Sequence, residues 1–187
     1  MPYAKKIAAA IATIMALPAI ACAATIGGVY YAPQYDYTDF WAATDNKTFQ
    51  VILEGNPFPN LAADDVAQRL LPAMQAAKPR PNLTFTYSNP AEMPRPYYRL
   101  VLVFDYANDL RADAVCEGKM RTGPGTPGIF KLFAIYCRND MAMSQTTAWT
   151  PTTGPDDPRI QQLFRELFMV VFSDSTSLRP QNGLERR

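Results

Sequence analysis

The chain contains no histidine, and this limits the chemistry that its other residues can perform. Histidine is the general base of Ser-His-Asp and Cys-His catalytic systems and a common zinc ligand. A catalytic site would therefore depend on carboxylates, lysines, hydroxyl groups or tyrosines. We expect no metal or other cofactor, because Cys116 and Cys137 without further Cys or His do not complete a coordination shell.

Carboxylate pairs are the remaining catalytic candidates, since a glycosidase needs only two carboxylates about 5–10 Å apart. Four acids are expected at strand ends or in loops near the sheet edges: Glu54, Glu92, Asp105 and Asp109. Their spacing singles out no pair. The acids at 64–65 and 156–157 lie where helices are expected to begin, and the helix macrodipole explains them without catalysis. The sequence thus predicts no catalytic residue and favours a protein that is not an enzyme.

The glycine-rich segment 122–128 (Thr-Gly-Pro-Gly-Thr-Pro-Gly) is a candidate phosphate-binding loop. It lacks the Lys and Ser/Thr that follow the glycines of such a loop, and its prolines remove N–H groups that would bind phosphate. We interpret it as the tip of a β-hairpin.

The first residues have the layout of a secretory signal. Lys5 and Lys6 precede an uncharged apolar run at 7–17, and small residues follow it, with cleavage expected after Ala21 or Ala23. The run is shorter than the roughly 20 residues that span a bilayer. We therefore predict a signal peptide at 1–22 and an exported protein.

Cys22 leaves two mature forms open. A cysteine after Ala-Ile-Ala is where a bacterial lipoprotein is cleaved and acylated, which would tether the protein to a membrane. Lipoprotein signals usually carry Leu three residues before the cysteine, where this chain has Ala19, so a periplasmic or secreted form without lipid is the alternative.

Without the two signal lysines, 16 of the 18 basic residues remain against 17 acidic ones, a net charge of −1. Such a surface gives no electrostatic reason to bind nucleic acid. Export places Cys116 and Cys137 in an oxidising compartment, where a disulfide is expected. The two lie symmetrically about the segment 122–128, and in a hairpin centred there they would face each other. Two buried free thiols are the alternative.

Hydrophobic patterning predicts strands at 48–53, 83–87, 97–106, 116–121 and 129–137, and a weaker edge strand at 143–150. A helix is expected from about Ala62, and Pro72 should kink it or end it near Leu71. A second helix follows Asp157 as N-cap and Pro158 at its first position. The order β-α-β-β-β-β-α predicts an α+β domain, a mostly antiparallel sheet with two helices packed on one face.

Four regions follow from these patterns. They are the signal at 1–22, an aromatic-rich N-terminal arm at 23–47, a single α+β domain at 48–173 and a flexible tail at 174–187. We expect the aromatics of the arm to pack on the domain; stacking on a sugar or peptide ligand is the alternative.

Four stretches carry a resemblance: residues 49–58, the strand 98–105, the segment from Cys116 to Cys137, and Gly-Pro-Asp-Asp-Pro-Arg at 154–159. Together they resemble a group of exported, lipoprotein-like proteins of Gram-negative bacteria to which no activity is assigned. The resemblance covers roughly residues 40 to 172. It implies export and a fold, but it assigns no functional residues. We therefore expect a non-enzymatic cell-envelope protein that binds another envelope component, a protein or a glycan. The alternative is a carboxylate-based enzyme that acts on envelope carbohydrate.

Overall fold

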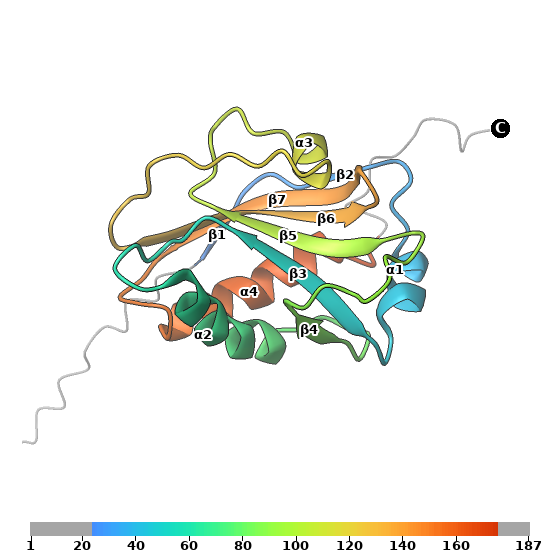
Figure 1. Ribbon diagram of the computed structural model, residues 1–187, viewed down its shortest axis with the longest axis horizontal. Helices are drawn as coiled ribbons and strands as arrows, with labels where there is room; N and C mark the ends of the chain where they lie inside the picture. Colours follow the sequence, from blue (N-terminus) through green and yellow to red (C-terminus); the bar gives the residue numbers. More distant parts are fainter. Residues whose placement is uncertain (1–23, 176–187) are drawn as a thin grey trace, which may run out of the picture.

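A computed structural model describes residues 24–175, in which seven strands form one sheet with the order β1-β7-β6-β5-β3-β4 and with β2 beside β7 (Figure 1). The elements in chain order are β1 (Thr25–Ile26), β2 (Tyr30–Tyr31), α1 (Tyr37–Thr44), β3 (Thr48–Glu54), α2 (Ala63–Ala76), β4 (Thr84–Thr86), β5 (Tyr98–Phe104), α3 (Ala112–Cys116), β6 (Ile129–Arg138), β7 (Met141–Pro151) and α4 (Pro158–Val171). The predicted signal peptide, Cys22 and most of the predicted tail lie outside the described residues.

The sheet is mixed, so the predicted mostly antiparallel sheet is wrong. Strand β3 runs parallel to both of its neighbours, β4 and β5, whereas β5, β6 and β7 pair antiparallel. After β3 the chain crosses through α2 and returns as β4 in the same direction, a connection long enough for a parallel crossover. Propensity locates strands but carries no information on their direction, which is why the sequence did not reveal these parallel pairs.

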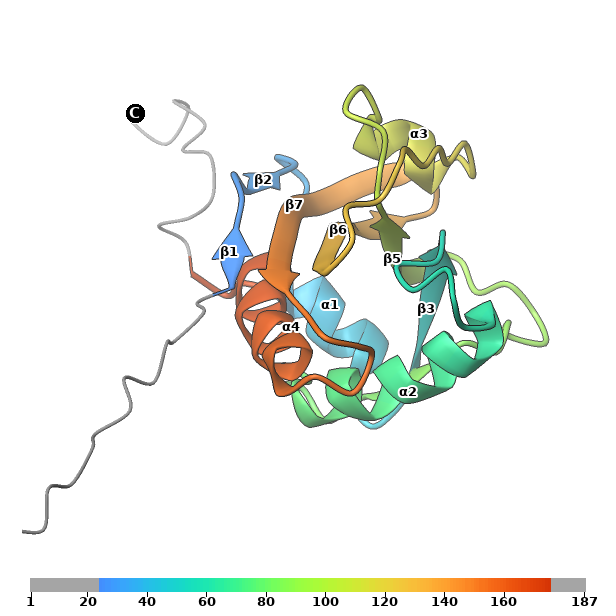
Figure 2. The ribbon, with the colours of Figure 1, turned by 90° about the vertical axis from the view of Figure 1, so that its left-hand side faces the viewer.

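The helices lie on both faces of the sheet, not as two helices on one face. Side chains of α1, α2 and α4 pack in the larger core, around Leu70, Leu100 and Phe164. Helix α3 packs on the opposite face, where Val115 joins Val103 in a second cluster. Figure 2 shows α3 on one side of the sheet and α1, α2 and α4 on the other. The sequence missed α3 because its five residues are too short for a helical pattern to stand out.

The N-terminal arm supplies two strands and a helix. Strands β1 and β2 pair with β7, so β7 is not the edge strand that its weak alternation suggested. The arm buries Tyr31, Tyr35 and Phe40, while Tyr30 and Trp41 stay exposed. The phenol of Tyr35 donates a hydrogen bond to the carbonyl of Ser173, at 2.8 Å, which ties the arm to the end of α4.

Two further predictions differ from the structure. Residues 116–121 form no strand, so the predicted hairpin around 122–128 is absent; β6 instead forms a hairpin with β7. Of the two effects expected of Pro72, an end of the helix is not observed: α2 continues through it to Ala76, since buried Val66, Leu70 and Met74 hold the helix against the core despite the lost hydrogen bond. Helix α4 begins as predicted, with Asp157 as N-cap and Pro158 in its first turn.

Candidate functional site

A cavity of about 570 Å³ lies at the carboxyl ends of the parallel strands β3 and β5. The helix that follows β3 packs on one face of the sheet, and the helix that follows β5 packs on the other. The chain therefore leaves the two adjacent strand ends in opposite directions. Such a divergence opens a crevice at the carboxyl edge of a sheet, which is the usual ligand position in sheets with parallel strands.

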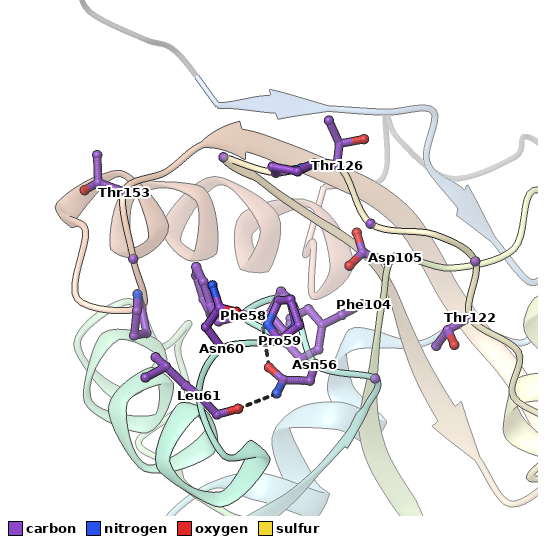
Figure 3. Close-up of a pocket in the computed structure, with 18 residues that line it drawn as sticks. Asn56, Phe58, Pro59, Asn60, Leu61, Phe104, Asp105, Thr122, Thr126 and Thr153 are labelled. Carbon is purple, nitrogen blue, oxygen red and sulfur yellow. Dashed lines mark hydrogen bonds between the residues drawn. The ribbon is translucent and has the colours of Figure 1, made fainter.

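Four segments line this cavity, which we call the Asp105 cavity. They are the loop 55–61 after β3, the end of β5 with Asp105, the loop 122–128 before β6, and residues 153–155 after β7. Figure 3 shows Asp105 and Thr126 on one side, with Phe58 and Leu61 across from them. The segments are far apart in sequence, so the cavity exists only in the folded chain.

The loop after β3 is held by the side chain of Asn56. Its Oδ1 accepts a hydrogen bond from the Phe58 N–H at 3.0 Å, and its Nδ2 donates to the Leu61 carbonyl at 2.8 Å. Gly55 begins the loop with a φ of +81°, a conformation that other residues rarely adopt. The Phe58 ring stacks on Phe130 with 6.0 Å between centroids. One wall is thereby fixed by an Asx turn and an aromatic contact.

Asp105 is the only ionisable residue among those that line the cavity. Its φ of +45° lies in the left-handed region, where Asp is tolerated better than most residues. The backbone holds it there, because its N–H donates to the Lys131 carbonyl at 3.1 Å and its carbonyl accepts from the Gly123 N–H at 2.5 Å. Burial raises the pKa of the Asp105 carboxyl, and the positive charge of Lys131 opposes part of that rise.

The wall at 153–155 is fixed by the N-cap of α4. The Asp157 carboxylate accepts hydrogen bonds from the N–H and the hydroxyl of Thr153, and from the backbone and guanidinium of Arg159. The bond from Arg159, followed by the bonds from Thr153, holds the pKa of Asp157 well below its usual range. The predicted helix start therefore also positions a wall of the cavity.

The predicted acids do not converge. Only Asp105 lines the cavity; Glu54 precedes Gly55 at the end of β3, Glu92 is exposed, and Asp109 pairs with Arg121 at the surface. Asp64 and Asp65 occupy the first turn of α2, and Asp156 pairs with Arg69 at the surface.

Cys116 and Cys137 form the predicted disulfide, with 5.7 Å between their Cα atoms. It joins the end of α3 to β6 instead of bridging a hairpin. The disulfide therefore anchors the long connection 105–128, which carries two walls of the cavity.

Sequence reasoning missed the role of the glycine-rich segment 122–128. It lines the cavity and passes beside Asp105, rather than forming a hairpin tip. A signal was available, since Gly55 and Asp105 directly follow the last residues of β3 and β5, both of which were predicted as strands. It becomes informative only once those strands are known to be parallel neighbours.

Within residues 24–175, no three His, Cys, Asp or Glu side chains gather in a way that could hold a metal ion. In the same part of the chain, every helix is too short or too polar to cross a membrane.

Comparisons with known proteins give no family assignment. No family model matches the chain, and no curated protein matches it. Among solved structures, the PelC dodecamer from Paraburkholderia phytofirmans and a point variant of it align with TM-scores of 0.42 and 0.41. Each is 12% identical to this chain, over 80% of this chain and 96% of the other. Similarity at this level does not support a transfer of function.

Proposed function

We propose that this is an exported cell-envelope protein that binds a neutral saccharide in the Asp105 cavity. The observation that carries the proposal is the composition of that cavity. One partly desolvated carboxylate lies among proline, phenylalanine, glycine and threonine residues, with no cationic side chain in the lining.

A saccharide matches both parts of this lining. Its hydroxyl groups would donate to the Asp105 carboxylate, and glycines at positions 55, 123, 125, 128 and 154 bring backbone without side chains to the cavity wall. The C–H faces of sugar rings match the apolar surfaces of Phe58 and the prolines. An anionic ligand would find no partner for its charge and would be repelled by Asp105.

The composition supports binding rather than hydrolysis. Both inverting and retaining glycosidases use a pair of carboxylates on either side of the scissile bond. The lining supplies one, and Asp105 has no acidic partner there. We therefore propose a binding protein, and release of reducing sugar by the purified protein would argue for the enzyme instead.

Export is supported by the signal layout at 1–22 and by the Cys116–Cys137 disulfide, since such bonds persist in oxidising compartments. The resemblance to exported, lipoprotein-like proteins agrees with an exported location. Intact-mass measurement of membrane and soluble fractions tests it. A mature chain that begins at Cys22 with a diacylglycerol mass would establish the tethered form, whereas a chain that begins at Cys22 or Ala24 without lipid would establish the other form. Recovery of the uncleaved chain would contradict export.

Binding is tested by titrating neutral N-acetylglucosamine oligosaccharides into ¹⁵N-labelled protein. We expect amide shifts in loops 55–61 and 122–128, and a loss of affinity of about tenfold or more in Asp105→Asn, since hydrogen bonds to charged groups contribute about 1.5–3 kcal/mol. Asp140→Asn is the matched control, because Asp140 is exposed in the turn at the other end of β6. Equal affinities of the two variants would overturn the proposal, as would shifts that lie outside these loops.

A further inference from the structure

Strand β3 pairs with a different neighbour along each half of its length. Strand β4 pairs with residues 48–50 of β3, whereas β5 pairs with residues 51–54 from the other side. In the described part of the chain no strand continues β4 along residues 51–54. Figure 1 shows the short β4 beside the beginning of β3. An open strand edge of this kind offers backbone N–H and C=O groups to another chain.

A groove of about 470 Å³ follows this open edge. Residues 50–53 of β3 form one side, and Asp64, Ala67 and Gln68 of α2 form the other. Tyr87 also lines the groove, and its hydroxyl donates to the Ala67 carbonyl at 2.9 Å. Ala67 is small, so the groove keeps room beside the strand for an extended backbone.

Gln50 provides a second, independent sign of a missing partner. Its side chain is buried, with 6% of the residue exposed, and it lines the groove. Its Nε2 donates to Asn89 Oδ1 at 2.6 Å, but its Oε1 has no hydrogen-bond partner among the described residues. Buried polar atoms are rarely left unpaired, because an unpaired acceptor costs about 1–3 kcal/mol. Oε1 is therefore suited to a donor that enters the groove.

The charged residues around the groove indicate which kind of peptide segment it binds. Asp64 lines the groove, Asp65 follows it on α2 and Glu54 ends the open edge of β3, while the lining contains no basic residue. A segment that carries Lys or Arg would meet complementary charge there.

We propose that residues 51–54 of β3 accept an extended, basic peptide segment of another protein as an added strand. The segment pairs with β3 through its backbone, donates a hydrogen bond to Gln50 Oε1 and places a Lys or Arg near Asp64. Strand addition at an open edge is an established way to recognise peptides, with affinity from main-chain bonds and specificity from side-chain contacts. This site is separate from the Asp105 cavity. Failure of the peptide-binding proposal would therefore leave the saccharide-binding proposal unaffected, and the reverse also holds.

The test selects short random peptides on the mature protein by display. We expect the enriched peptides to carry Lys or Arg and to slow amide hydrogen exchange in residues 51–54 when they bind. The absence of any enriched peptide would overturn the proposal, as would peptides that bind without protecting these amides. Dimerisation of the protein through this edge, detected by light scattering and abolished by Ala67→Leu, would also overturn it, since a second copy would then be the occupant.

Two matched pairs of variants localise the binding. Asp64→Lys should weaken the selected peptides by about tenfold or more, and Asp65→Lys should change their affinity little. Both variants lose an acid in the first turn of α2, so the difference between them isolates the groove. Ala67→Leu should fill the groove and abolish binding, whereas Ala76→Leu, at the far end of the same helix, should not. Equal effects within either pair would contradict the proposal.

Gln50→Met separates recognition from stability. It removes the unpaired Oε1 and also the Nε2 bond to exposed Asn89, two opposing effects on stability, so the unfolding temperature should change little while peptide affinity falls about tenfold. An unchanged peptide affinity in this variant would contradict the proposed hydrogen bond between Gln50 Oε1 and the bound peptide.

Discussion

The carboxylate of Asp105 lies against the α-carbon of Gly125. A Cβ on Gly125 would lie 2.5 Å from Asp105 Oδ2 and 3.0 Å from its Cγ, closer than real contacts allow. The glycine therefore lets the loop 122–128 pass directly beside the only ionisable group of the cavity. This contact explains a glycine that the sequence suggested only as part of a turn.

Gly125→Ala should displace the Asp105 side chain and weaken oligosaccharide binding about tenfold, since the charged hydrogen-bond acceptor leaves its place. The fold should remain, because the displaced atoms are the end of a side chain rather than backbone. Isothermal titration calorimetry and thermal unfolding measure the two effects. Gly28→Ala is the control, since a Cβ there meets nothing within 4 Å. Equal affinity in the two variants would contradict the role of Asp105.

Asp105→Asn should stabilise the ligand-free protein at neutral pH while it weakens binding. Burial raises the pKa of Asp105, so the folded state holds its proton to a higher pH than the unfolded state does. Stability therefore falls as pH rises from the unfolded value of 3.8 through the raised folded value. The asparagine side chain does not ionise, so the variant does not lose this stability. Its unfolding temperature should be roughly 1–2 °C higher than that of the wild type at pH 7 and equal to it at about pH 3.

Thermal unfolding across this pH range measures the difference. Asp140→Asn, at the exposed β6–β7 turn, controls for the change in net charge. A lower unfolding temperature of Asp105→Asn at neutral pH would indicate a structural role for the carboxylate instead of one in binding.

Asp157→Ala should lower stability by about 2 kcal/mol, or roughly 4–8 °C, because it removes the N-cap of α4 and the bonds to Arg159 and Thr153. The folded pKa is depressed by the bond from Arg159, so this stability is present above the unfolded value of 3.8 and is lost as pH falls towards the folded pKa. The difference from wild type should thus shrink in acid. Asp156→Ala, which breaks only an exposed pair with Arg69, should change stability by less than about 1 kcal/mol.

The double variant Cys116→Ser and Cys137→Ser should lose about 3 kcal/mol of stability, since the disulfide closes a loop with a sequence separation of 21. Chemical denaturation with and without reductant measures this loss. Reductant should destabilise the wild type to a similar degree and leave the double variant unchanged. Equal stability of wild type and variant would mean that the bond does not hold α3 to β6 in solution.

Some elements were predictable because their signals are local. The spacing of Ile160, Leu163 and Phe164 after Asp157 and Pro158 places α4, since a cap, a proline and a helical period act within a few residues. Strands β3 and β5 are similarly visible as apolar runs. The partner of Cys116 follows because Cys137 is the one other cysteine outside the predicted signal peptide.

Other features depend on segments distant in sequence. Strand direction and order depend on which edges meet, and residues 48–54 contain nothing that distinguishes a parallel partner from an antiparallel one. The same limit hid α3, whose five residues are stabilised by Val103 and the disulfide rather than by their own pattern.

The sequence by itself therefore determined the cysteine pair, the positions of α2 and α4 and the absence of histidine chemistry, and it predicts an export signal at 1–22, outside the described residues. Only the tertiary structure decided that β3 and β5 run parallel, and this places Gly55, Asp105 and Gly125 around one cavity. It also decided that β4 stops short and leaves residues 51–54 with an open edge beside Gln50. The physical reason is that local patterns report the conformation of a segment and the face it buries, whereas sites form where separate segments end together.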